Sequence, residues 1–226
     1  MHEQFWQLTD PGSQSSLAEW DDGMDFERIT CSLKPGHQRP GKRFGELRVI
    51  LPNRPVQDFV WTWISDCLIQ DHVLELFKQN SLTGYMVKPV KARFKRSGSP
   101  APPRLWEVVV TGWGGMASAD SGVRLLESCP GCGHLRYSAE TPGSKIIDPA
   151  QWDGSDFFIV WPYPRFILIS DRVAQLIRDN RIEGAQLQRF EENRKPRVGD
   201  GLSPGRLSYW FPLERAKEIG RPLGII

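Results

Sequence analysis

The chain has few of the residues on which nucleophilic, redox or metal chemistry depends. Its 226 residues include only four cysteines and four histidines. It contains neither the Gly-x-Ser-x-Gly motif of serine hydrolases nor the His-Glu-x-x-His motif of zinc proteases. The glycine-rich segment 111–116 (TGWGGM) lacks the residue spacing of a phosphate-binding loop. The sequence therefore predicts a protein that is not an enzyme.

Long hydrophobic runs are also missing from the sequence. No apolar stretch approaches the roughly 18 residues that a transmembrane helix needs. The first residues, MHEQFWQLTDPGSQSS, lack the basic region and apolar run of a signal peptide. We therefore expect a cytoplasmic protein with no membrane partner. The 29 basic and 27 acidic residues nearly balance, and this argues against nucleic acid as the main partner.

What the sequence does contain is an internal repeat. Residues 68–87 (LIQDHVLELFKQNSLTGYMV) align with residues 168–187 (LISDRVAQLIRDNRIEGAQL) at an offset of 100, with seven identities in twenty. Unrelated segments would share about one or two. An aromatic stretch precedes each copy, at 58–64 and 156–161, and extends the match with a gap of two residues.

Each copy has the pattern of a strand, a helix and a second strand. In the first copy a short apolar run predicts a buried strand, and Asp71 is expected to cap the helix that follows. Val73, Leu76 and Phe77 recur at i, i+3 and i+4, which gives that helix one apolar face. Asn80 marks its end, and the same pattern returns 100 residues later, with Ser170 or Asp171 as the expected cap.

These patterns predict an α+β fold: a duplicated strand–helix–strand module in mixed sheets, with a zinc-ribbon-like knuckle between the copies. Segment 97–103 (SGSPAPP) is rich in turn-forming residues and predicts a linker. The first module then covers residues 1–96 and carries a degenerate first knuckle, and residues 104–226 hold the intact knuckle and the second module. We expect the two pseudo-repeats to form one compact unit.

The sharpest local motif is CPGCG at residues 129–133. Its Pro-Gly turn brings the sulfurs of Cys129 and Cys132 toward one ion, and zinc suits such a pair best. A structural zinc site needs four ligands, and the remaining candidates are Cys31, His37, His134 and Cys67. Cys67 lies in an apolar run and is expected in the core.

The predicted metal-ligand set is therefore Cys31, His37, Cys129 and Cys132. The first knuckle reads CSLKPGH from residue 31, so Lys34 stands where a second C-x-x-C would have its cysteine. Two interpretations stay open: an occupied zinc site, or a remnant knuckle whose fold no longer needs metal. A thioredoxin-like redox role is disfavoured because Gly133 follows Cys132 where a helix former is needed.

The nine tryptophans are a second unusual feature. Those in predicted strands are expected to fill the core. Aromatic residues flanked by glycine or proline are instead predicted as contact anchors for a protein partner, namely Trp113, Trp152 and Tyr163.

Several of these motifs together resemble a known family. They are the segment 106–137, in which TGWGGM leads into SCPGCG, followed by WDGSDF at 152–157, VWP at 160–162 and DRV at 171–173. This combination resembles the myxobacterial double-CXXCG motif family, whose members are regarded as immunity proteins of Sit-type contact-dependent toxin systems. Of the family's first CXXCG, this chain keeps only Cys31.

The resemblance implies an immunity protein that binds and neutralises a cognate protein toxin delivered by neighbouring cells, without chemistry of its own. The alternative is a zinc-ribbon nucleic-acid-binding protein, which the five basic residues in 88–96 would support. A third possibility is a redox enzyme that uses Cys129 and Cys132.

Overall fold

The structure is a computed structural model of the chain, and it describes residues 4–12, 17–52, 54–193 and 201–225. One large sheet has six strands, in the spatial order β2 (Glu19–Trp20), β5 (Leu47–Leu51), β8 (Tyr85–Phe94), β9 (Leu105–Val110), β7 (Cys67–Gln70) and β6 (Phe59–Trp61). The other has five, in the order β10 (Gly112–Met116), β13 (Phe157–Trp161), β14 (Ile167–Ser170), β1 (Phe5–Thr9) and β15 (Gln186–Arg189).

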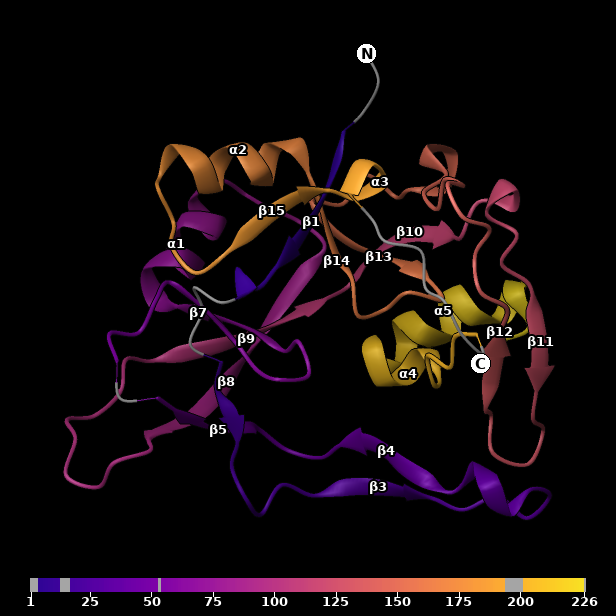
Figure 1. Cartoon of the computed structure of the whole chain (residues 1–226), viewed down its shortest axis with the longest axis horizontal. Coiled ribbons are helices and arrows are strands. Elements are labelled where there is room, and N and C mark those ends of the chain that lie inside the picture. Colours follow the sequence, from indigo (N-terminus) through magenta and orange to yellow (C-terminus); the bar gives the residue numbers. More distant parts are fainter. Residues whose placement is uncertain (1–3, 13–16, 53, 194–200, 226) are drawn as a thin grey trace.

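Two separate hairpins and several helices complete the fold (Figure 1). The hairpins pair β3 (Phe26–Ile29) with β4 (Arg39–Arg43), and β11 (Leu125–Ser128) with β12 (Leu135–Tyr137). The helices are α1 (Asp71–Gln79), α2 (Asp171–Asp179), α3 (Phe190–Asn193), α4 (Leu207–Trp210) and α5 (Leu213–Leu223). The fold is therefore α+β, as predicted. Within the described ranges, every helix is too short or too polar to cross a membrane.

The main hydrophobic core takes residues from both halves of the sequence. At its centre the rings of Phe77 and Phe157 lie 5.3 Å apart, and both side chains are fully buried. A smaller core lies under β5, where Leu47, Val49 and Leu51 pack with Leu68 and Leu105. Burial of this apolar surface is the main force that holds the halves together.

Helices α1 and α2 lie at the same end of the molecule (Figure 1) and have the same design. Each starts directly after a buried strand and ends at an asparagine, Asn80 or Asn180, whose side-chain amide donates to the carbonyl oxygen four residues earlier at 2.9 Å. The buried face of α1 consists of Val73, Leu74 and Phe77. The expected member Leu76 is only half-buried, because the apolar face is centred one residue earlier.

Of the expected N-caps only Ser170 occupies the cap position, and its side chain makes no capping hydrogen bond. Asp71 and Asp171 are the first helical residues, and their carboxylates accept hydrogen bonds from tryptophans of distant strands instead of capping the helix amides. The indole nitrogen of Trp106 donates to Asp71 at 2.5 Å, and that of Trp6 donates to Asp171 at 2.9 Å. A charged acceptor makes such a hydrogen bond stronger than a neutral one.

These tryptophans belong to two strands that each complete the sheet of the other half. Strand β1, at the start of the chain, pairs with β14 and β15 of the second half. Strand β9, which follows the predicted linker, pairs with β7 and β8 of the first half. The registers correspond, because Trp6 is opposite Ile169 and Trp106 is opposite Ile69. The segment 97–103 therefore divides the sequence into two halves, but each large sheet contains strands from both halves.

Two glycines mark the closest contacts between the halves. Gly84 and Gly184 follow the two helices and have φ angles of 79° and 82°. A Cβ on Gly84 would lie 2.0 Å from the carbonyl oxygen of Phe157, and one on Gly184 would lie 2.2 Å from that of Phe59. Each glycine thus brings its own backbone against the aromatic strand of the opposite half.

We predict that Gly84→Ala and Gly184→Ala destabilise the protein by similar amounts. The matched control is Gly98→Ala, because Gly98 has a φ of 82° and open space around it. The control should cost about 1 to 2 kcal/mol from backbone strain alone, and the clash should add about 1 to 3 kcal/mol in the other two. Denaturant unfolding measures all three variants. If either buried-site variant were as mild as Gly98→Ala, the close approach would be wrong.

Candidate metal centre

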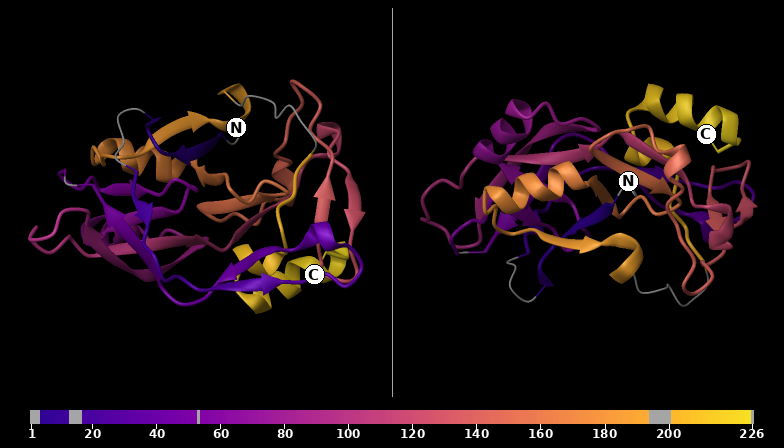
Figure 2. Two further views of the ribbon diagram at one scale, coloured as in Figure 1. Left: turned by 60° about the horizontal axis from the view of Figure 1, so that its bottom comes forward. Right: turned by 90° about the horizontal axis from the view of Figure 1, so that it is seen from above.

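The predicted metal ligands lie on two hairpin turns from opposite halves of the chain. The turn between β11 and β12 carries Cys129 and Cys132, and it is closed by a backbone hydrogen bond of 2.8 Å from Gly133 to Cys129. Gly133 adopts a φ of 64°, which suits glycine. The turn between β3 and β4 carries Cys31 and a short 3-10 helix that ends at His37. Two further views show the β3–β4 hairpin reaching across to β11 and β12 (Figure 2).

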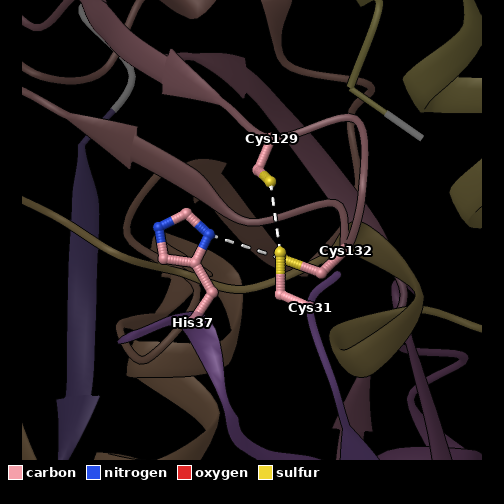
Figure 3. Close-up of side chains that lie close together, drawn as sticks. All are labelled: Cys31, His37, Cys129 and Cys132. Atoms are coloured by element: carbon pink, nitrogen blue, oxygen red, sulfur yellow. Dashed lines mark hydrogen bonds between the residues drawn. The ribbon is translucent and has the colours of Figure 1, made fainter. Parts of the chain in front are cut away.

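The four side chains converge on one point (Figure 3). The sulfurs of Cys31 and Cys129 are 3.7 Å apart, and the sulfur of Cys132 is 3.6 Å from Nδ1 of His37. All four potential ligand atoms lie within 4.8 Å of one another. A tetrahedral zinc ion with bonds of about 2.0 to 2.3 Å spaces its ligands by roughly 3.5 to 3.8 Å. The predicted cluster is therefore confirmed, and these residues could hold a metal ion.

Hydrogen-bond donors around the cluster favour the thiolate forms of Cys31 and Cys132. Burial alone raises the pKa of Cys31, but the N–H groups of Lys34 and Leu33 donate to its sulfur and bring the pKa below the ordinary thiol value. The Lys34 N–H lies 3.3 Å from that sulfur. Burial also raises the pKa of Cys132, but the guanidinium of Arg39, 3.8 Å away, outweighs it together with further N–H donors. The thiolate is the form that binds metal.

Cys129 differs from the other two thiols. Burial raises its pKa, and the neighbouring cysteines add to the effect, so its net pKa lies above the ordinary value. Three thiols this close cannot all ionise without a compensating positive charge. A bound dication supplies that charge and favours loss of the remaining proton.

Lys34 and Glu127 complete the surroundings of the cluster. The ammonium of Lys34 lies 2.6 Å from Oε1 of Glu127, and this contact lowers the pKa of the carboxyl. The same oxygen is 3.4 Å from Nε2 of His37. A carboxylate on the outer nitrogen of a ligating histidine fixes the ring and raises its basicity. Sequence reasoning missed Glu127, although it stands two residues before Cys129.

The other two candidate ligands lie outside the cluster. The ring of His134 packs on that of His37 with centroids 4.4 Å apart. Cys67 lies in β7 within the main core, as expected, and burial raises its pKa well above the ordinary value. These positions leave Cys31, His37, Cys129 and Cys132 as the ligand set.

The predicted contact anchors are less exposed than expected. Trp152 is partly buried against Phe5, with ring centroids 5.1 Å apart, and its indole nitrogen donates to a backbone carbonyl. Trp113 is partly buried against Phe211. Tyr163 is only 4% exposed, and its hydroxyl donates to Glu140. The expectation that Tyr163 is available on the surface is therefore wrong, because its ring stacks on that of Phe166 within the main core.

No family model matches the chain, and no curated protein matches it. The family resemblance therefore depends on the motifs given above.

We predict that the purified protein binds one zinc ion per chain. At a free zinc concentration about a thousand times the dissociation constant, binding should stabilise the fold by about 4 kcal/mol. The melting temperature should then rise by about 8 to 16 °C. Zinc titration with metal analysis gives the stoichiometry, and thermal unfolding with and without chelator gives the shift.

The ligand assignment is tested by single substitutions. Cys31→Ser, His37→Ala, Cys129→Ser and Cys132→Ser should each weaken zinc binding strongly. Cys67→Ala is the matched control, since Cys67 is equally buried but lies in the core. A control that lost zinc, or a Cys132→Ser variant that kept full affinity, would contradict the assignment.

Proposed function

We propose that the protein is a non-catalytic immunity protein that binds and neutralises a cognate toxin delivered by neighbouring bacterial cells. The observation that supports this best is the closed donor set of the cluster. Three cysteines and one histidine fill the four positions that zinc prefers in structural sites. Catalytic zinc sites keep one position for water or substrate. We therefore propose a structural zinc ion.

The proposed zinc ion would join the two halves. Cys31 and His37 come from the first half and Cys129 and Cys132 from the second, so one ion would cross-link hairpins about 100 residues apart in sequence. Closing so long a loop restricts the unfolded chain strongly. The ion would thereby fix the surface that both halves present to a partner.

We further propose that the halves arose by duplication, with β1 and β9 exchanged. Equivalent contacts support this proposal in addition to the matched registers. The N–H of Ala18 donates to the carbonyl of Trp61 at 2.7 Å, and that of Ala117 donates to the carbonyl of Trp161 at 2.6 Å. Each copy would then supply one knuckle, which agrees with the resemblance to double-CXXCG proteins. In the first knuckle, His37 would replace the cysteine lost at Lys34.

The alternative function, nucleic-acid binding, has less support. The basic stretch 88–96 lies mostly in β8, and three of its cations are already paired with carboxylates on neighbouring segments: Lys91 with Glu46 at 3.0 Å, Arg93 with Asp21 at 2.8 Å and Lys95 with Glu19 at 3.1 Å. Paired cations contribute little to the release of counterions that drives phosphate binding. The strand therefore offers no continuous basic surface.

We expect the protein to co-purify with the product of the neighbouring toxin gene when the two are co-expressed, and to protect cells in proportion to its amount. A binding inhibitor acts stoichiometrically, so protection should fail once toxin exceeds inhibitor. Survival is measured against the ratio of the two proteins. Complete protection by a small molar fraction of the protein would indicate turnover and contradict the proposal.

A metal exchange separates a structural ion from a catalytic one. Replacing zinc by cadmium should leave toxin binding unchanged within about twofold, because a closed thiolate site accepts either soft ion. The Cys129→Ser/Cys132→Ser double variant should lose protection only as far as circular dichroism shows that it unfolds. A double variant that is well folded and still binds the toxin but gives no protection would mean that the thiols act chemically.

A further inference from the structure

A groove of about 660 Å³ opens beside the metal centre. Its walls come from β4, from β8 and β9 of the six-stranded sheet, and from α4, which contacts β4 (Figure 1). Segments from both halves line it, including Arg165 from the turn before β14. The groove is large enough for several side chains of a partner.

Four cations line this groove without a carboxylate partner. Arg39, Lys42, Lys88 and Arg165 form no ion pair with any of the described residues, and together they define what we call the basic groove. Lys42 donates to the backbone carbonyl of Ser208 and interacts electrostatically with Glu27. Arg165 donates to the backbone carbonyl of Ile64 and lies over the ring of Trp210. About half of the other described Lys and Arg side chains also lack an ion pair, so what distinguishes these four is that they line one groove.

The positive charges in the basic groove repel one another. Burial lowers the pKa of Lys42, and the nearby ammonium of Lys88 lowers it further. Two acids also line the groove: Glu107 is paired with Arg43 at 2.5 Å, and Asp66 accepts from the neutral indole of Trp20 at 2.7 Å, a contact that does not cancel its charge. The Lys and Arg residues of the lining still outnumber these two carboxylates. The groove therefore keeps a positive potential that an anionic group would relieve.

Unsatisfied polar atoms lie in the same walls. Among the described residues, four buried side-chain nitrogen or oxygen atoms have no hydrogen-bond partner, and all four belong to residues of this groove: Arg39, Arg43, His134 and Tyr209. Buried polar groups without partners cost free energy. These atoms are buried from solvent, so they show that the polar packing of the walls is incomplete, and they do not themselves face an occupant.

The mouth of the groove carries exposed apolar side chains. Ile64 and Met86 line it and are 40% and 39% exposed, and the adjacent Trp63 is 71% exposed. Exposed tryptophans next to charged pockets are typical anchors of protein interfaces. Trp63 lies outside the lining of the groove, so it would contact a partner larger than a small molecule.

We propose that the basic groove receives an acidic segment of the toxin, with Trp63 as the apolar anchor at its mouth. This inference rests on the proposed function and names the surface that performs it. Carboxylates complement the cations that line the groove and can accept hydrogen bonds from them. A nucleic-acid strand fits less well, because the cations of β8 beyond the groove are already paired.

The test measures affinity for the purified, catalytically inactivated product of the neighbouring toxin gene. Lys88→Glu, Arg165→Glu and Trp63→Ala should each weaken binding by about tenfold or more, and the salt dependence should fall in the two charge variants. Lys91→Glu is the matched charge control, since Lys91 lies on the same strand but outside the groove. Leu126→Ala is the apolar control, because Leu126 is 48% exposed on β11. Both controls should bind within about twofold of the wild type.

The outcomes distinguish failure of the groove as the interface from failure of the proposed immunity function. If the wild type binds the toxin and the three groove variants bind equally well, the groove is not the interface and the immunity function stands. If the wild type does not bind the toxin, both are overturned. If a single-stranded DNA oligonucleotide binds instead and Lys88→Glu abolishes it, the groove is a nucleic-acid site. Melting temperatures confirm that every variant is folded.

Discussion

The pairing of β1 with the second half and of β9 with the first half is the constraint on which the rest of the structure depends. Each strand closes the sheet of the opposite half, and its tryptophan binds the first aspartate of that half's helix. Neither half can then bury its apolar face or satisfy its strand edges alone. The two halves must fold as one unit, although a turn-rich segment divides their sequences.

This mutual closure also places the metal centre. Once the sheets are joined, the β3–β4 hairpin of the first half lies against the β11–β12 hairpin of the second (Figure 2). Cys31 and Cys129, 98 residues apart, come within 3.7 Å. The positions of the four side chains are thus set by the packing of the two halves, while N–H groups of each tight turn help to lower the pKa of Cys31 and Cys132. An ion at this point would hold in place two hairpins that have little core of their own.

The same geometry links the metal centre to the proposed interface. Arg39 donates to the sulfur of Cys132 and also lines the basic groove, and His134 packs on His37 from the groove side. Loss of the metal would therefore disturb the wall of the groove as well as the hairpins. On the proposed function, a structural ion would act on recognition indirectly, by fixing the cations that meet the partner.

The sequence by itself determined the two repeated helices and the four residues of the candidate metal centre. The offset of 100 residues located both helices, and the knuckle motifs identified Cys31, His37, Cys129 and Cys132, because periodicity and short-range spacing encode helices and turns. The same offset relates Trp6 to Trp106, a signal that could have revealed the exchanged strands. Only the tertiary structure decided which half each strand completes, that Glu127 supports His37, that Tyr163 is buried and that four unpaired cations share one groove. Those facts depend on contacts between residues far apart in sequence, and no local pattern records them.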